Sequence, residues 1–171
     1  MRLVGKRVIV TGGSSGIGRA ICELFSKEGA KIVVADVDES GGKETASLIA
    51  SEDRPCLFVS ADVSSNSDVE NLLHRSFQFF GGVDILVNNA AAFVFGKVED
   101  VTKADWETVF GVNLIGAANT TAAALPYLRE SGGASIVNIA SIGSFKPAPG
   151  FVPYCSSKGA LLELTRCLAM D

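Results

Sequence analysis

The amino-acid sequence predicts an α/β fold built on a doubly wound parallel sheet. Short runs rich in β-branched residues alternate with amphipathic helical stretches along the chain. Most of these runs are apolar on both faces, as in a parallel sheet that is covered by helices on each side. Repeated strand–helix units of this kind join parallel strands through right-handed crossovers. We therefore expect a single domain over residues 1–171.

Five strand-like segments form the predicted sheet. They are RVIVTG, KIVVADV, CLFVSADV, VDILVNNA and ASIVNIAS, which begin at Arg7, Lys31, Cys56, Val83 and Ala134. Each is short and apolar, and each is followed by a polar or glycine-containing turn, which is typical of a buried parallel strand.

Amphipathic helices are predicted between these strands. They cover residues 17–28, 40–51, 67–80 and 103 to about 128, and a last helix is expected to begin near Tyr154 and run to the end of the sequence. Glycines stand where helices are expected to end, because a left-handed C-terminal residue is easiest for glycine. These glycines are Gly29, Gly81, Gly82, Gly132 and Gly133.

Composition and charge limit the classes of function. The chain has 171 residues, 47% of them hydrophobic, which is enough for a sizeable core in one domain. The net charge is −4 and charges of both signs are interspersed, which argues against nucleic acid as a partner. No continuous apolar run approaches the roughly 18 residues of a membrane span, and the N-terminus lacks a signal-peptide pattern. We therefore expect no membrane association.

The cysteines do not indicate a metal site, and the one histidine does not indicate a serine–histidine catalytic triad. Cys22, Cys56, Cys155 and Cys167 have no metal-ligand spacing and no disulfide pattern. We expect buried or half-buried thiols in a reducing compartment, namely the cytoplasm. His74 lies in a polar helical stretch, and a solvated helix face is the preferred interpretation.

The segment TGGSSGIG, residues 11–18, joins the first strand to the first helix. Glycine lets the backbone approach a pyrophosphate, and a helix N-terminus offers free N–H groups and a positive dipole. An ordinary strand–helix turn is the alternative, but this context favours nucleotide binding. The candidate cofactor contacts in this turn are Gly12, Ser14, Ser15, Gly16, Ile17 and Gly18.

Asp36 closes the second strand, eighteen residues after Gly18. An acidic residue at this place can hydrogen-bond the ribose hydroxyls of adenosine. Its carboxylate would repel the extra phosphate of NADP, and no arginine or lysine stands at Ser14, Ser15 or Val37 to bind that phosphate. The predicted cofactor is NAD.

The segment PYCSSKGA places Tyr154 and Lys158 four residues apart. On a helix this spacing puts both side chains on one face, with β-carbons about 5–6 Å apart. A cation close to a phenol favours the phenolate, which suits acid–base work near neutral pH. A surface tyrosine beside a solvated lysine is the alternative interpretation.

Taken in order, these motifs resemble the short-chain dehydrogenase/reductase family, from about residue 6 to residue 171. The family's glycine-rich signature is matched by TGGSSGIG, its adenine-contacting motif by ADV at residues 61–63, and its fourth-strand motif by NNA at residues 88–90. Its catalytic asparagine, serine, tyrosine and lysine are matched by Asn113, Ser141, Tyr154 and Lys158. The fold implied by the resemblance is Rossmann-like.

The resemblance implies a role for each matched residue. Tyr154 is the general acid–base for the substrate oxygen, and Lys158 supports it and holds the nicotinamide ribose. Ser141 hydrogen-bonds the same substrate oxygen, and Asn113 holds a water that links Lys158 to solvent. The remaining cofactor contacts implied by the resemblance are Asp62, Val63, Asn89 and Ala90.

One position departs from the family pattern. Glycine usually follows NNA, whereas this chain has Ala91. If the position requires a positive φ, alanine is strained there, and the backbone leading to Phe93 and Phe95 shifts.

The predicted reaction interconverts a secondary alcohol and a ketone on a largely apolar small molecule. Phe145, Phe151 and Val152 lie between the serine and the tyrosine, where the substrate pocket is expected, and Lys146 is the one charge there. Packing of a loop or a subunit contact is the alternative role for these apolar side chains. The alternative functions are a weakly active or inactive NAD-binding protein, and a lyase or epimerase that uses NAD transiently.

The resemblance also implies that complete relatives continue beyond the tyrosine–lysine helix with further strands. We therefore expect a truncated form that lacks C-terminal strands and leaves the fifth strand as a bare sheet edge. Such a chain is expected to be poorly soluble or oligomeric, to bind NAD weakly and to show little turnover. A full-length form is expected to be a homo-oligomer.

Overall fold

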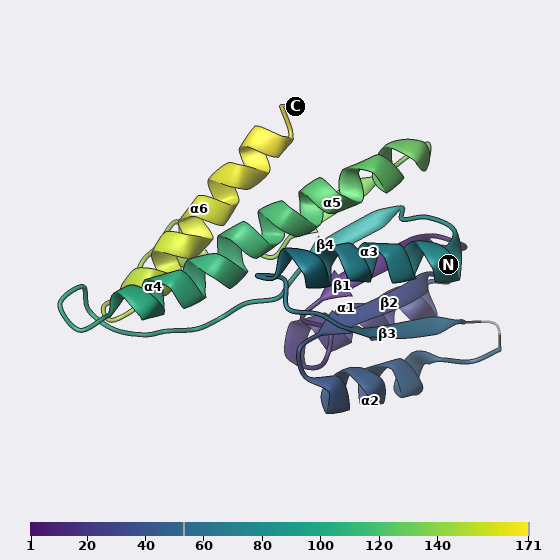
Figure 1. Ribbon diagram of the computed structural model, residues 1–171, viewed down its shortest axis with the longest axis horizontal. Helices are drawn as coiled ribbons and strands as arrows, with labels where there is room; N and C mark the ends of the chain where they lie inside the picture. Colours follow the sequence, from purple (N-terminus) through teal and green to yellow (C-terminus); the bar gives the residue numbers. More distant parts are fainter. Residues whose placement is uncertain (53, 171) are drawn as a thin grey trace.

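A five-stranded parallel sheet forms the centre of the protein (Figure 1). The computed structural model describes residues 1–52 and 54–170. The strands lie in the order β3-β2-β1-β4-β5. They are β1 (Arg7–Thr11), β2 (Lys31–Asp36), β3 (Cys56–Ser60), β4 (Ile85–Asn88) and β5 (Ser135–Asn138). The predicted doubly wound α/β fold is confirmed.

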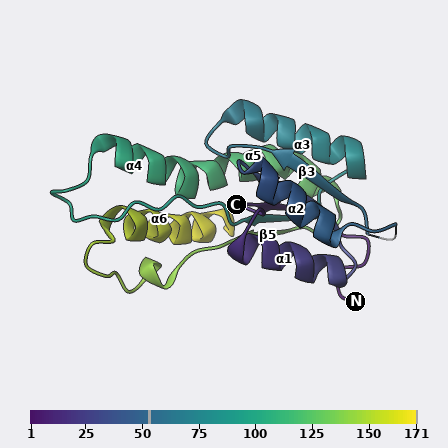
Figure 2. The same cartoon turned by 90° about the horizontal axis from the view of Figure 1, so that it is seen from below.

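Helices cover both faces of the sheet, as the doubly apolar strands require. On one face α1 (Gly16–Lys27) and α2 (Glu39–Ile49) pack over a core that includes Val8, Val10 and Cys22. On the other face α3 (Asn66–Phe80) and α5 (Ala117–Glu130) pack over a second core. Figure 2 shows α3 and α5 on the side of the sheet opposite to α1.

The single long helix predicted from residue 103 is divided into three parts. It consists of α4 (Lys103–Phe110), a π-helical turn η1 (Gly111–Gly116) and α5. A π turn inserts an extra residue into a helix and is frequent at functional sites. The final helix, α6 (Val152–Leu168), contacts α4 and η1 and runs beside them in both views (Figures 1 and 2). The prediction that this helix runs to the end of the sequence is wrong, because it ends at Leu168 and the next two residues form a turn; Asp171 itself lies outside the described residues.

The helical stretch Lys103–Glu130 is long and apolar enough to cross a membrane, judged by length and composition alone. The sequence contains no continuous apolar run of this length, but part of this helix has the mean hydropathy of a membrane span. Its hydropathy has a structural cause, because Ala124 and Leu128 are buried in the core against the sheet. A core helix of this kind meets the same criterion.

Several local predictions can be compared directly with the structure. Gly29, Gly81 and Gly132 have the left-handed φ expected after a helix, Gly82 has a φ of +157°, and Gly133 has no positive φ. His74 is exposed on α3, as expected. Burial raises the pKa of the Cys22 and Cys56 thiols to about 12, which disfavours the thiolate, the reactive form of cysteine. The expectation of burial is wrong for one cysteine, Cys167, which is exposed.

A partly buried ion pair joins the start of β1 to the residue before β4. The Arg7 guanidinium donates to both carboxylate oxygens of Asp84, at 2.7 and 3.0 Å, and the Arg7 backbone N–H donates to the same group at 2.8 Å. Asp84 is only 6% exposed. The hydrogen bonds from Arg7 hold the pKa of this carboxyl below its usual value.

Arg7→Leu is expected to lower the free energy of unfolding by about 3 kcal/mol, because a buried carboxylate is left without its cation. Since the pKa of Asp84 is lower in the folded state, the contribution of the pair is present above the unfolded value of about 3.9 and is lost as the pH falls through the folded value. Urea unfolding at neutral pH and at acidic pH measures both effects. The matched control is Arg2→Leu, which removes an exposed pair with Glu28 and should barely change the unfolding midpoint. An equal loss in the two variants would contradict this account.

Candidate functional site

A cleft of about 590 Å³ lies at the carboxyl ends of the strands. It crosses the place between β1 and β4 where the strand order reverses, which is where open α/β sheets bind ligands. Most of the predicted cofactor residues line this cleft. They are Gly12, Ser14, Ser15, Gly16, Ile17, Asp36, Asp62, Val63, Asn89, Ala90, Tyr154 and Lys158.

The glycines of the first turn meet three different steric demands. Gly12 has a φ of +66°, and a β-carbon there would lie 2.8 Å from the Cα of Ala90. A β-carbon on Gly18 would collide with the carbonyl oxygen of Gly12, so this glycine permits close packing of α1 and does not line the cleft. Gly16 has a φ of +52° and faces open space. The turn thus leaves room for a ligand at Gly16.

The first turn of α1 is open to an anion. Ser15 is the N-cap residue, but its side chain makes no capping hydrogen bond to the helix in the described structure. The N–H groups that begin a helix otherwise have no intrahelical partner, and they attract negative charge. An uncapped helix start beside the open space at Gly16 therefore fits a diphosphate group.

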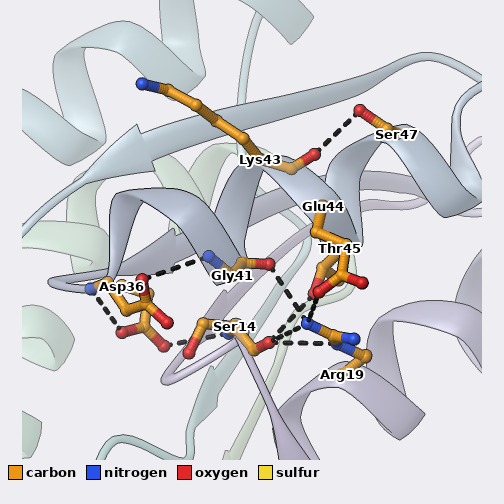
Figure 3. Close-up of polar contacts among 9 residues, drawn as sticks. Ser14, Arg19, Asp36, Gly41, Lys43, Glu44, Thr45 and Ser47 are labelled. Carbon is orange, nitrogen blue, oxygen red and sulfur yellow. Dashed lines mark hydrogen bonds and ion pairs between the residues drawn. The ribbon is translucent and has the colours of Figure 1, made fainter.

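Asp36 also fixes the shape of the glycine-rich turn (Figure 3). Its carboxylate accepts hydrogen bonds from the backbone N–H of Ser14 at 2.9 Å and of Asp38 at 3.0 Å. The Ser14 carbonyl accepts from the Arg19 guanidinium at 2.6 and 3.0 Å and from the Thr45 hydroxyl at 3.3 Å. The peptide groups on both sides of Ser14 are therefore held, and the residue predicted to bind ribose is one of the groups that hold them.

The end of β4 is joined to the same turn. The Asn89 side chain donates to the carbonyl oxygens of Thr11 at 3.0 Å and Gly12 at 2.9 Å. The backbone N–H groups of Asn89 and Ala90 both donate to the Thr11 hydroxyl at 3.1 Å. Over residues 1–52 and 54–170 only glycines have a positive φ, so Ala91 is unstrained and the shift considered from the sequence has no cause.

Asp62 and Val63 follow β3 and line the cleft beside Asp36 and Val37. The Asp62 carboxylate accepts from the backbone N–H of Ser64 at 2.8 Å and from its hydroxyl at 2.7 Å. These contacts fix the short loop after β3 and leave Val63 buried against it.

Tyr154 and Lys158 lie one turn apart on α6 and both line the cleft. Lys158 is 2% exposed, and its ammonium donates to the carbonyl oxygen of Ile139 at 2.7 Å. Burial lowers the pKa of Lys158 to about 8. The Tyr154 ring is stacked on Phe93, with centroids 4.9 Å apart and planes inclined by 20°.

Asn113 lies in the π turn η1, outside the lining of the main cleft. Its side chain accepts from the Ala92 N–H at 2.7 Å and donates to the Ala92 carbonyl at 3.0 Å and to the Ser157 hydroxyl at 2.9 Å. Ser157 in turn donates to the Tyr154 carbonyl at 2.8 Å. The Asn113 side chain therefore links the segment after β4 to α6. No signal in the sequence identified Ser157 as its partner.

Ser141 begins a short turn after β5 and also lies outside the lining of the main cleft. Its hydroxyl accepts from the Gly143 N–H at 3.0 Å and keeps its own proton to donate. The turn is fastened to α6, because the Ser144 hydroxyl donates to the Lys158 carbonyl at 2.8 Å. The chain thus fixes Ser141 relative to Lys158.

Comparisons with known proteins agree with this arrangement. The chain is 38% identical to an uncharacterized oxidoreductase of Thermotoga maritima, over 99% of this chain and 66% of that protein. It is 35% identical to the human dehydrogenase/reductase SDR family member 4, over 99% of this chain and 61% of that protein. A crystal structure of a short chain dehydrogenase/reductase from Burkholderia phymatum in complex with NAD matches with a TM-score of 0.94 at 34% identity, over 98% of this chain and 60% of that one.

The chain therefore spans about two thirds or less of the length of these proteins. The family model for short chain dehydrogenases matches residues 6–171. With its Rossmann-like sheet and its ordered motifs, the chain belongs to the short chain dehydrogenase family.

Proposed function

We propose that this chain forms the NAD-binding and catalytic part of an oxidoreductase that interconverts a secondary alcohol and a ketone. The observation that carries the proposal is the joint placement of Tyr154 and Lys158 in the same cleft as the glycine-rich turn and Asp36. One end of the cleft suits a nucleotide, and the other end presents a phenol beside a buried ammonium. The NAD complex of the Burkholderia relative supports the choice of cofactor.

The residues that would hold NAD follow the cleft from end to end. The open start of α1 would bind the diphosphate, and Asp36 would accept from the adenosine ribose hydroxyls. Asp62 and Val63 would flank the adenine, and Lys158 would donate to the nicotinamide ribose. When bound, NAD supplies the acceptor or donor of hydride.

Tyr154 would exchange a proton with the substrate oxygen. Tyr154 is the one tyrosine among the residues that line the cleft. The ammonium of Lys158, held by the Ile139 carbonyl at 2.7 Å, lies one helical turn from Tyr154 on the same cleft. The Ser141 hydroxyl, which keeps its proton to donate, would hydrogen-bond the same substrate oxygen.

Asp36→Ala is expected to weaken NAD binding about ten- to a hundredfold, because a charge-assisted hydrogen bond to ribose is lost. NADP affinity should fall less or rise, because the repulsion of its extra phosphate is also removed. Calorimetric titration with both cofactors measures the change. Asp36→Asn keeps an oxygen that can accept from the Ser14 N–H, so it separates the loss of ribose binding from the loss of support for the glycine-rich turn. The control is Asp100→Ala, which changes an exposed turn residue. Equal wild-type affinity for NAD and NADP would contradict the assignment.

A panel of secondary alcohols incubated with NAD tests the proposed reaction. Growth of the absorbance band of reduced nicotinamide is the expected result. Product without net reduced cofactor would instead indicate a lyase or epimerase, and NAD binding without any product would indicate a binding protein. Product without net reduced cofactor would overturn the proposed oxidoreductase, and so would binding without product when the same panel is given to the full-length form.

The compartment and assembly are part of the same proposal. The four free cysteines agree with a reducing, cytoplasmic environment. We propose a small-molecule alcohol or ketone as the partner, with no role for nucleic acid or a membrane, and a homo-oligomeric full-length form.

A further inference from the structure

Three phenylalanines extend the cleft beyond Tyr154 as a continuous aromatic surface. Phe93 stacks on the Tyr154 ring, and Phe95 lies 6.2 Å from Phe93 and 4.7 Å from Phe151, measured between ring centroids. Phe95 also lies 6.4 Å from the Tyr154 ring. Phe93 itself lines the main cleft. We call Phe93, Phe95 and Phe151 the aromatic wall.

The aromatic wall is exposed to solvent. The exposed fractions are 58% for Phe93, 57% for Phe95 and 38% for Phe151. An isolated exposed phenylalanine is ordinary, but several in mutual contact form an apolar patch, and such patches mark binding sites. This patch begins at the proposed catalytic phenol, so its placement indicates a ligand that reaches that phenol.

Backbone hydrogen bonds hold the wall in position. The Gly96 N–H donates to the Gly150 carbonyl at 2.7 Å, and the Val152 N–H donates to the Gly96 carbonyl at 3.3 Å. Gly96 and Phe151 thereby form a parallel bridge between segments that are far apart in the sequence. The Asn113 side chain holds the backbone of Ala92, which directly precedes Phe93 in the segment after β4. The rings are therefore organised before a ligand binds, which lowers the entropy cost of binding.

The chemistry of the wall favours a flat, unsaturated ring. Aromatic rings attract one another in offset-stacked and edge-to-face arrangements, beyond the contribution of buried area. A saturated ring of the same size gains the area term but not the ring–ring term. A chain built only for apolar substrates could use leucine or valine here. Instead, the rings of Phe93 and Phe95 lie 4.9 and 6.4 Å from the Tyr154 ring, between centroids, and Phe151 packs on Phe95.

We propose that the aromatic wall binds the ring of an aryl alcohol or aryl ketone whose oxygen-bearing carbon is attached to that ring. This inference rests on the proposed oxidoreductase function for the placement of the substrate oxygen at Tyr154. Phe93 and Phe95 contact the substrate ring, and Phe151 supports Phe95 from the α6 side.

The test compares two ketones with the same number of carbon atoms, acetophenone and cyclohexyl methyl ketone. For the wild-type chain with reduced NAD, kcat/KM for acetophenone is expected to exceed that for the saturated ketone by about fivefold or more. Phe93→Leu and Phe95→Leu keep an apolar side chain and should bring the ratio close to one. Phe79 is an exposed residue of α3 and is not part of the wall, so Phe79→Leu should leave the ratio unchanged.

Binding is measured separately from turnover by ligand-observed NMR of each ketone with the NAD-loaded protein. Acetophenone binding that depends on Phe93 without any turnover supports the wall and overturns the proposed reaction. Turnover of both ketones with a ratio near one, or a ratio that Phe93→Leu does not change, overturns the wall and leaves the reaction standing. No binding of either ketone overturns the wall, and the panel of secondary alcohols described above then decides the reaction.

Discussion

Replacement of Tyr154 by phenylalanine is expected to lower kcat about a thousandfold while NAD affinity changes less than about twofold. The substitution removes one oxygen and keeps the ring that stacks on Phe93. Turnover should therefore be lost because the proton has no carrier at the substrate oxygen, and not because the cleft has changed shape. Steady-state kinetics and calorimetric titration with NAD measure the two quantities.

The chain supplies a matched control for this substitution. Tyr127 is its second tyrosine, half-buried on α5 and in contact with Phe77, well outside the cleft. Tyr127→Phe should leave both kcat and NAD affinity unchanged. If Tyr154→Phe retained most of the wild-type activity, the acid–base role of this phenol would be wrong.

Lys158→Met is expected to reduce both NAD affinity and turnover, the affinity by about ten- to a hundredfold, because the charged donor proposed for the ribose is lost. The pKa of about 8 adds a pH signature. The ammonium is present below this pH and is lost above it, so wild-type affinity should fall as the pH rises through about 8. Affinity of the methionine variant should show no such step. Lys146→Met, at an exposed lysine, is the control.

The same substitution should stabilise the fold at neutral pH. Because the pKa of Lys158 is lower in the folded state than the unfolded value of about 10.4, the unfolded chain binds more protons between these two values. The buried charge is therefore destabilising below about pH 8, and this penalty is relieved as the pH rises. A higher Tm for Lys158→Met at pH 7 is the expected result, and a lower Tm would show that the lysine is mainly structural.

The fold was predictable because its signals are local. Each strand is a short apolar run, and glycines such as Gly29 and Gly81 end the helices with a positive φ. The pairing of Tyr154 with Lys158 was equally accessible, because a spacing of four residues on a helix fixes a common face. The glycine-rich turn and Asp36 could be assigned to one site because adjacent parallel strands end at the same edge of a sheet.

The parts that escaped prediction depend on contacts between distant segments. The sequence predicted one unbroken helix where the π turn η1 separates α4 from α5. It could not show that the Asn113 side chain bonds to Ala92 and Ser157, because these partners lie in distant segments. The Lys158 ammonium donates to the backbone carbonyl of Ile139. Every residue has such a carbonyl, so the sequence could not identify this partner.

The aromatic wall illustrates the same limit. Phe93, Phe95 and Phe151 are visible in the sequence, but a bridge between Gly96 and Phe151 brings them together, and turn-rich segments carry no pairing signal. The sequence therefore left two roles open for Phe151, a pocket wall or a loop contact. The ring contacts place it beside Phe95, next to the proposed catalytic phenol.

Transfer of deuterium to NAD tests the central claim most directly. The wild-type chain is incubated with NAD and secondary alcohols that carry deuterium on the oxygen-bearing carbon, and the recovered cofactor is weighed by mass spectrometry. We predict deuterated reduced NAD with the wild-type chain and with Tyr127→Phe, and none above background with Tyr154→Phe. Reduced cofactor without deuterium, or equal deuterium transfer by wild type and Tyr154→Phe, would contradict the account.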